Sequence, residues 1–106
     1  MINYHFNDTS LNKHIVDKLS AAYLSSKRFV SDKVSVHSNF EHQRQHIVFF
    51  IESVIKNNLN ENDRFIITNE VLLGKKGNWY HEYLSTSTYY RHRKLAYANF
   101  LSCLDK

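Results

Sequence analysis

The chain has 106 residues and a formal net charge of +4, with 42% hydrophobic residues, two glycines and no proline. This length suits one domain, and the hydrophobic content is too high for a disordered chain. All-β sandwiches and barrels need frequent turns, which glycine and proline usually provide. We therefore expect an all-α protein, a small bundle of about five helices formed by residues 1–106.

The single cysteine, Cys103, excludes an internal disulfide and a cysteine-cluster metal site. Because it falls late in an apolar pattern, we interpret it as a small core residue. The first ten residues, MINYHFNDTS, lack a basic segment followed by an apolar core, and no apolar run approaches the roughly 20 residues of a membrane helix. We expect no signal peptide, no membrane contact and a cytoplasmic location.

Apolar periodicity predicts a first helix over residues 8–24. Its cap would be Asp8, Thr9 or Ser10. Its apolar face would consist of Leu11, Ile15, Leu19 and Ala22, widened by Val16 and Tyr23. Residues 25–37 mix polar and apolar side chains, so a short helix and an irregular connection both fit them.

A second helix is predicted over residues 38–58, capped by Ser38 or Asn39 with Glu41 placed to reach back. Its stripe would be Phe40, Ile47, Ile51 and Val54. The run IVFFI (47–51) is apolar all round, which predicts a central helix covered on several sides. A buried strand could show the same short run, but the length and the polar flanks favour a helix.

The C-terminal half divides at turn-forming residues 57–63 and at the loop GKKGN (74–78). A third helix would run from Asn62 or Asp63 to Leu73 and end at Gly74. Residues 78–84 would form one or two helical turns. A longer helix, 85–104, would begin at Ser85 or Ser87. Its core face would comprise Tyr89, His92 or Arg93, Ala96, Phe100, and Cys103 or Leu104.

A short helix, a turn and a longer helix form a helix-turn-helix candidate, here at about residues 62–104. In that motif the second helix enters the DNA major groove by its N-terminal end, where free N–H groups favour phosphate. Residues 75–94 contain five basic side chains against Glu82 alone. The predicted DNA-binding residues are the tip residues Thr86, Ser87 and Thr88, the exposed residues Tyr90, Arg91 and Lys94, and the loop residues Lys75 and Lys76.

The segment LSTSTYYRHRKLAYANFL resembles the recognition helix of ArpU-type phage transcription regulators, which are similar to the last DNA-binding region of bacterial sigma factors. The matching positions are Leu84, Ser87, Thr88, Tyr89, Tyr90, Arg91, Arg93 and Ala96. A small family from mycoplasma-like bacteria is also similar. The resemblance covers roughly residues 59–104 and implies a helix-turn-helix that binds DNA. The segment NWYHEYL departs from it, because the first motif helix usually carries small residues.

Several of these side chains also have a purely structural interpretation. Trp79, Tyr80 and Tyr83 could stack on bases, but such residues more often fill a core. Tyr89 is expected in the core, and Arg93 could pack its stem against the third helix. Arg91 and Lys94 could simply belong to a solvated face.

The sequence offers little support for metal binding or catalysis. His42 and His46, spaced i, i+4, would share a helical face, but no third ligand is obvious. The chain has no Gly-rich phosphate loop, nucleophile elbow or spaced carboxylate pair. We expect that the protein binds no metal and no cofactor and is not an enzyme.

The leading prediction is a helix-turn-helix protein that binds double-stranded DNA, as a transcription regulator or a sigma-like accessory factor. Its N-terminal helices could also supply a homodimer surface, because symmetric regulators read paired half-sites. The alternative is a helical interaction module that binds a protein such as RNA polymerase without touching DNA. A wide exposed apolar patch around Trp79 and Tyr83 would favour the alternative.

Overall fold

The structure is a computed structural model that describes residues 7–31 and 39–105, without the side chains of residues 29–31 and 39–42. Within these ranges it contains helices and no strand. The elements are α1 (Thr9–Ser31), α2 (Asn39–Asn58), α3 (Glu61–Ile67), the π-helical segment η1 (Thr68–Leu72), the 3-10 turn η2 (Trp79–Glu82) and α4 (Thr86–Leu104). The all-α class is confirmed, with four α-helices in the described residues where about five helices were expected.

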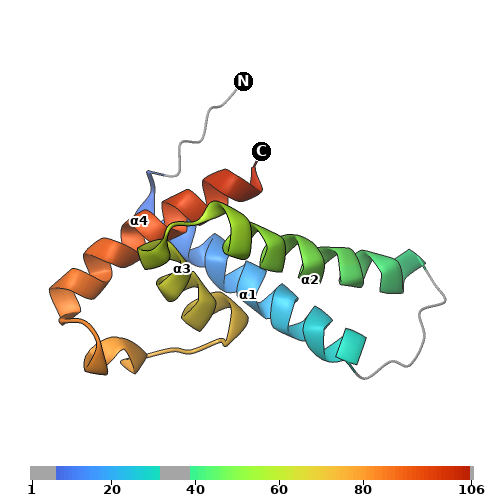
Figure 1. Cartoon of the computed structure of the whole chain (residues 1–106), viewed down its shortest axis with the longest axis horizontal. Coiled ribbons are helices and arrows are strands. Elements are labelled where there is room, and N and C mark those ends of the chain that lie inside the picture. Colours follow the sequence, from blue (N-terminus) through green and yellow to red (C-terminus); the bar gives the residue numbers. More distant parts are fainter. Residues whose placement is uncertain (1–6, 32–38, 106) are drawn as a thin grey trace.

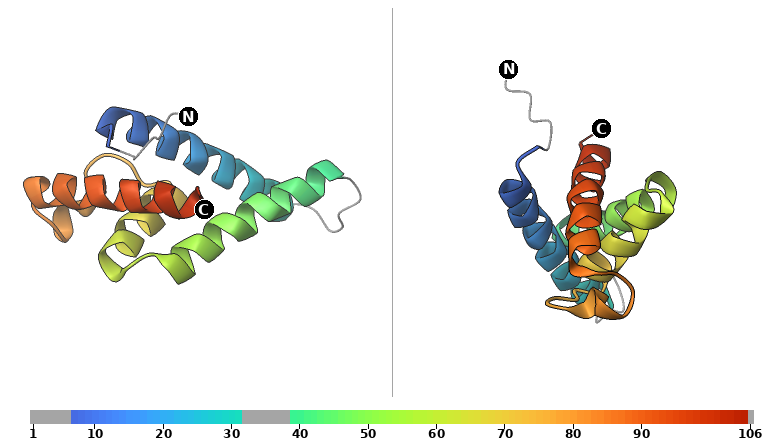
Figure 2. Two further views of the ribbon diagram at one scale, coloured as in Figure 1. Left: turned by 90° about the horizontal axis from the view of Figure 1, so that it is seen from above. Right: turned by 90° about the vertical axis from the view of Figure 1, so that its left-hand side faces the viewer.

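The two long N-terminal helices, α1 and α2, pack against each other, and α4 contacts both of them (Figures 1 and 2). Helix α3 packs against α4, and its continuation η1 packs against α1. The first turns of α4 extend beyond α3, next to the segment that contains η2 (Figure 1). This arrangement holds the middle and end of α4 in the core and leaves its beginning at the edge of the molecule.

Helix α1 begins at a cap and continues beyond its predicted end. The backbone N–H of Leu11 donates to Asp8 Oδ1 at 2.9 Å, so Asp8 caps the helix. The helix continues to Ser31 because residues 25–31 contain no helix breaker. The Lys27 ammonium lies 2.9 Å from Glu52 of α2 and joins the two helices there. The rest of the ambiguous segment, 32–37, lies outside the described residues.

The predicted apolar face of α1 is right in part, because Val16 and Tyr23 are buried and Ile15 and Leu19 pack against the core. Leu11 is 41% exposed and Ala22 is exposed, whereas Ile15 and Leu19 are half-buried. The buried positions are Asn12, Val16, Ser20, Tyr23 and Ser26. Ser20 can occupy this face because its hydroxyl is hydrogen-bonded: it donates to the Val71 carbonyl at 3.0 Å. A search for apolar residues alone therefore finds Val16 and Tyr23 but misses the buried polar positions Asn12, Ser20 and Ser26.

Helix α2 is a helix, as expected, but it is not covered on several sides. Its buried residues are Val48, Ile51, Val54 and Ile55, while Ile47, Phe49 and Phe50 are 40%, 77% and 49% exposed. Among the side chains that the structure describes, the buried ones of α2 lie on one side of the helix, and the run IVFFI also spans the opposite side. The predicted caps and Phe40 fall outside the described side chains.

Helix α3 begins at Glu61, where the side chain of Asn60 accepts from the Asp63 N–H at 2.8 Å. The helical run widens into η1 and ends at Gly74, which has φ +65°. The predicted glycine terminator is thus confirmed. A Cβ at Gly74 would lie 2.8 Å from Leu24 Cδ1, so the chain also passes close to α1 here.

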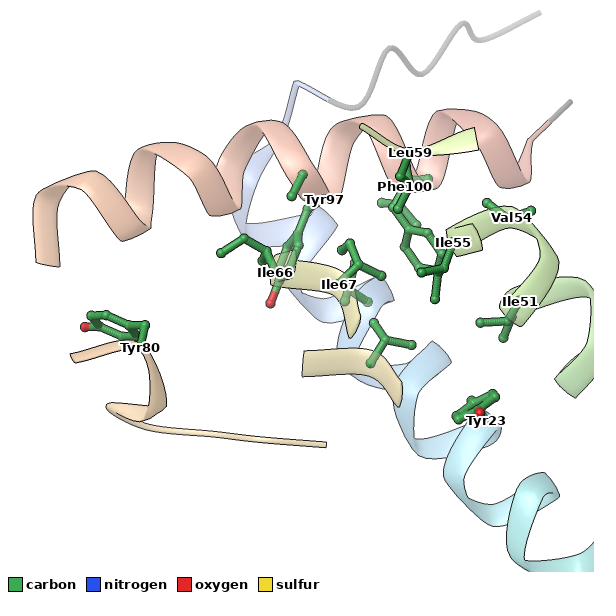
Figure 3. Close-up of a cluster of buried hydrophobic side chains, with 14 of the residues drawn as sticks. Tyr23, Ile51, Val54, Ile55, Leu59, Ile66, Ile67, Tyr80, Tyr97 and Phe100 are labelled. Carbon is green, nitrogen blue, oxygen red and sulfur yellow. The ribbon is translucent and has the colours of Figure 1, made fainter. Parts of the chain in front are cut away.

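One hydrophobic core joins all the α-helices (Figure 3). Phe100 of α4 and Ile66 and Ile67 of α3 are fully buried at its centre. The predicted core positions Tyr89, Ala96 and Phe100 of α4 are confirmed. Cys103 is half-buried and packs at the edge of the core.

Candidate nucleic-acid interface

The N-terminal end of α4 is built around Ser85. Its Oγ accepts from the Thr88 N–H at 3.3 Å and donates to Thr88 Oγ1 at 2.8 Å. Ser85 is therefore the cap, and Thr88 belongs to the cap and is half-buried. Of the three predicted tip residues, Thr86 and Ser87 remain exposed beside the first free N–H groups of the helix.

The first exposed basic side chains of α4 follow one turn later. Arg91 and Lys94 are both exposed and, three residues apart, lie on the same side of the helix. Neither has an ion-pair partner among the described residues. Tyr90 is 49% exposed. The predicted contact residues of α4 other than Thr88 are thus accessible at its projecting end.

Arg93 is placed differently from these neighbours. Its guanidinium carbon lies 4.7 Å from the ring centroid of Tyr90, 5.5 Å from that of Tyr97 and 5.8 Å from that of Tyr89. The guanidinium thus contacts tyrosines of its own helix, and the packing of the stem against the third helix stays a prediction. These cation–π contacts hold the guanidinium in place without neutralising it.

Beneath Arg93, one carboxylate collects three hydrogen bonds. Glu70 Oε2 accepts from the Trp79 indole N–H at 2.8 Å and from the Tyr89 hydroxyl, and Oε1 accepts from the Tyr97 hydroxyl. The bonds join η1, η2 and α4. Sequence reasoning missed this network. Its one visible signal is that Glu70 lies in the short polar segment TNE, between the apolar runs FII and VLL of residues 65–73.

Stacked rings fix the segment before α4. Tyr80 lies on Tyr89 with ring centroids 3.7 Å apart and planes 4° apart, and the Trp79 ring meets Tyr89 edge-on at 5.9 Å. Tyr80 and Tyr89 are buried, and Trp79 is half-buried. Tyr83 is 61% exposed, with its ring against Phe65 at 5.4 Å. The core interpretation is therefore confirmed for Tyr80 and Tyr89, whereas Tyr83 is accessible.

The environment keeps two of these phenols protonated. Burial raises the pKa of Tyr89, and the hydrogen bond to the Glu70 carboxylate and its negative charge raise it further. Burial and the same carboxylate likewise raise the pKa of Tyr97. Both tyrosines are hydrogen-bond donors to Glu70 over the physiological pH range and add no negative charge.

The loop lysines face α4 across a cleft of about 260 Å³, here called the α1–α4 cleft. Lys75, Lys76, Tyr90 and Arg93 line it, together with residues from the beginning of α1. The Lys75 ammonium lies 5.9 Å from the Trp79 ring centroid. Lys75, Lys76 and Tyr90 are thus brought together as predicted site residues, while Arg91 and Lys94 do not line this cleft and Thr86 and Ser87 lie at the end of α4.

The described residues contain no group of three or more side chains that could hold a metal ion. His46 is exposed, and the side chain of His42 lies outside the described residues. In the part of the chain that the structure covers, no helix is long and apolar enough to cross a membrane.

Where the first helix of the expected helix-turn-helix would lie, the structure has a single 3-10 turn. Element η2 comprises four residues in 3-10 conformation, followed by residues 83–85 and then α4. No protein-family model matches the chain, and no curated protein or solved structure is significantly similar to it. The resemblance to ArpU-type regulators and the helix-turn-helix therefore stay predictions.

Proposed function

We propose that this protein binds double-stranded DNA with the projecting end of α4 and acts as a transcription regulator or a sigma-like accessory factor. The observation that carries the proposal is the accessibility of Thr86, Ser87, Tyr90, Arg91 and Lys94 on the first turns of one helix. With α4 as the DNA-binding helix, η2 and residues 83–85 would take the place of the first helix and the turn of an ArpU-like helix-turn-helix.

The charge distribution supports this assignment. Residues 75–94 hold five of the 14 basic residues and one of the ten acidic residues, which leaves nine of each sign in the rest of the chain. The whole formal excess of +4 therefore belongs to the segment that contains the α4 end and the loop lysines. A local basic surface of this kind attracts the phosphate backbone of DNA.

The proposed contacts divide by chemistry. The free N–H groups and hydroxyls at Thr86 and Ser87 would meet a phosphate or a base edge, because only the end of a helix fits deeply into the major groove. Arg91 and Lys94 would contact phosphates or guanine one turn later. Lys75 and Lys76 would contact the flanking backbone.

The test is a titration with duplex DNA at several salt concentrations. Arg91→Ala/Lys94→Ala should weaken binding and reduce the slope of log K against log salt by roughly 2, because two phosphate contacts are lost. The matched control is Lys18→Ala/Lys56→Ala, which removes the same charge from exposed positions on α1 and α2. Equal losses in both variants would mean that only net charge matters and would contradict binding by α4.

The alternative, a module that binds a protein such as RNA polymerase, is favoured by a different surface from the one predicted. Of the predicted patch, Tyr83 is 61% exposed but Trp79 packs against the core, whereas Phe49 and Phe50 of α2 are 77% and 49% exposed. If the alternative holds, Phe49→Ser/Phe50→Ser should abolish binding to purified RNA polymerase, and Arg91→Ala/Lys94→Ala should not. Unchanged polymerase binding by the phenylalanine variant would contradict this use of α2.

A further inference from the structure

The α1–α4 cleft has a charge that its own residues do not balance. Four basic and two acidic side chains line it. Lys13 pairs with Asp17 at 2.7 Å, and the Glu70 carboxylate is occupied by the Trp79, Tyr89 and Tyr97 donors. Three cations, Lys75, Lys76 and Arg93, are left without a carboxylate partner among the described residues. Two formal positive charges therefore remain in the cleft.

These cations come from two separate segments, the loop before η2 and the second turn of α4. Arg93 is held over the rings of Tyr90 and Tyr97, at 4.7 and 5.5 Å. Lys76 is exposed beside Gly77, whose φ of +69° turns the loop at this point. A guanidinium and an ammonium that face one cleft match the geometry of a phosphate, which accepts several charge-assisted hydrogen bonds.

We propose that the α1–α4 cleft binds a phosphate monoester that carries a planar aromatic group, such as a nucleoside 5′-monophosphate, with its phosphate on Lys75, Lys76 and Arg93. The charge agrees, because a phosphate monoester carries about −1.5 to −2 near neutral pH. The 49% exposed Tyr90 at the same cleft supplies a ring for the base.

The volume limits the ligand. The cleft measures about 260 Å³, below the roughly 300–1,000 Å³ of sites that enclose drug-sized ligands. A sugar phosphate would fill it, and the base would lie at the rim on Tyr90. The same phosphate could belong to a free nucleotide or to the 5′ end of a nucleic-acid strand. Both would place one dianionic group among the same three cations.

This site goes beyond duplex binding by α4, although both proposals use Lys75, Lys76 and Tyr90. Arg93 belongs to the cleft alone and Arg91 and Lys94 belong to the α4 end alone, so the two proposals can fail separately. Calorimetric titrations would use adenosine 5′-monophosphate, adenosine, and a short single strand with either a 5′-phosphate or a 5′-hydroxyl. Trp79, the single tryptophan, donates to Glu70 and lies near Lys75, so its fluorescence reports on the cleft. The variants are Lys76→Ala and Lys76→Ala/Arg93→Gln, with Lys18→Ala as the control for an exposed lysine.

We expect adenosine 5′-monophosphate to bind and adenosine to bind at least tenfold more weakly, with Lys76→Ala costing about tenfold in affinity and the control nothing. If the source is a strand end, the 5′-phosphorylated strand binds about tenfold more tightly than its 5′-hydroxyl counterpart, and the free nucleotide does not bind. The proposal would be overturned if neither adenosine 5′-monophosphate nor the 5′-phosphorylated strand binds, or if adenosine binds as tightly as its monophosphate. It would also be overturned if Lys76→Ala and the double variant bind as tightly as the wild type. If Arg91→Ala/Lys94→Ala abolishes duplex binding, binding of the phosphate in the α1–α4 cleft should be unchanged.

Discussion

Glu70 joins three segments that are separate in the sequence. Its hydrogen-bond donors lie nine, 19 and 27 residues away, at Trp79, Tyr89 and Tyr97. A half-buried carboxylate with three donors is stabilised by charge-assisted bonds and, in turn, fixes the rotamers of the rings that line the α1–α4 cleft. The network therefore connects the packing of η2 with the shape of the candidate site.

Replacing the carboxylate tests this role. We expect Glu70→Gln to lower the free energy of unfolding by about 2 kcal/mol, because an amide offers one acceptor oxygen to three donors and turns N–H groups toward a phenol. Urea unfolding followed by circular dichroism measures the change. The control is Glu82→Gln, an exposed glutamate of η2. An equal effect in the two variants would contradict a structural role for Glu70.

The two phenols predict how stability depends on pH. The pKa values of Tyr89 and Tyr97 are raised above their ordinary value of 10.0 in the folded chain. Above about pH 10 the unfolded chain loses protons that the folded chain keeps, so the free energy of unfolding falls as pH rises, by up to ~1.4 kcal/mol per pH unit for each tyrosine. Below pH 10 this stabilisation is fully present.

Urea unfolding between pH 8 and pH 11 measures this dependence. Tyr97→Phe should lose stability at neutral pH and show a shallower decline in alkali, since one late-titrating phenol is gone. Tyr83→Phe, at a 61% exposed position, should follow the wild-type decline. A wild-type slope in Tyr97→Phe would show that this phenol is not the cause.

At the scale of the elements, the two glycines show how the loop between η1 and η2 is constrained. Gly74 and Gly77 both have positive φ, at +65° and +69°. A Cβ at Gly74 would meet Leu24 Cδ1 at 2.8 Å, whereas nothing lies within 4 Å of one at Gly77. Glycine is thus favoured at position 74 by both the positive φ and the close approach of Leu24, and at position 77 by the positive φ alone.

The pair gives a matched test. We expect Gly77→Ala to cost about 1 kcal/mol from backbone strain, and Gly74→Ala to cost about 1 kcal/mol more because Leu24 must move. Leu24→Ala in the Gly74→Ala background should show a favourable coupling in a double-mutant cycle. Identical costs at the two glycines, with no coupling to Leu24, would contradict the close approach of this loop to α1.

Local chemistry predicts where a helix begins and ends, but it predicts less well which face of the helix is buried. The caps Asp8 and Ser85 and the terminator Gly74 were predictable because each acts within a few residues. The buried face of α1 was predicted only in part: Val16 and Tyr23 are buried as expected, whereas Ser20 was missed because its hydrogen-bond partner, Val71, is 51 residues away. The exposure of Phe49 was missed because apolar periodicity does not reveal how many neighbours a helix has.

At the scale of the whole molecule, the excess positive charge lies in the part of the chain that contains the projecting end of α4. The basic segment 75–94 contains the loop, η2 and the projecting end of α4, and the remainder of the chain is balanced in charge. The basic segment was readable from the sequence. Helical spacing also separated the exposed pair, Arg91 and Lys94, from Arg93. The cleft that Arg93 lines was not predictable, because it depends on how the loop and α1 pack beside α4.

Duplex binding by the end of α4 is tested most directly by mapping backbone amide chemical shifts during titration with duplex DNA. If α4 binds the duplex as proposed, the largest changes fall on Thr86, Ser87, Arg91 and Lys94, the changes at the loop lysines are smaller, and all of them diminish as salt increases. Changes centred on Phe49 and Phe50 of α2, or no changes at low salt in a folded sample, would contradict it.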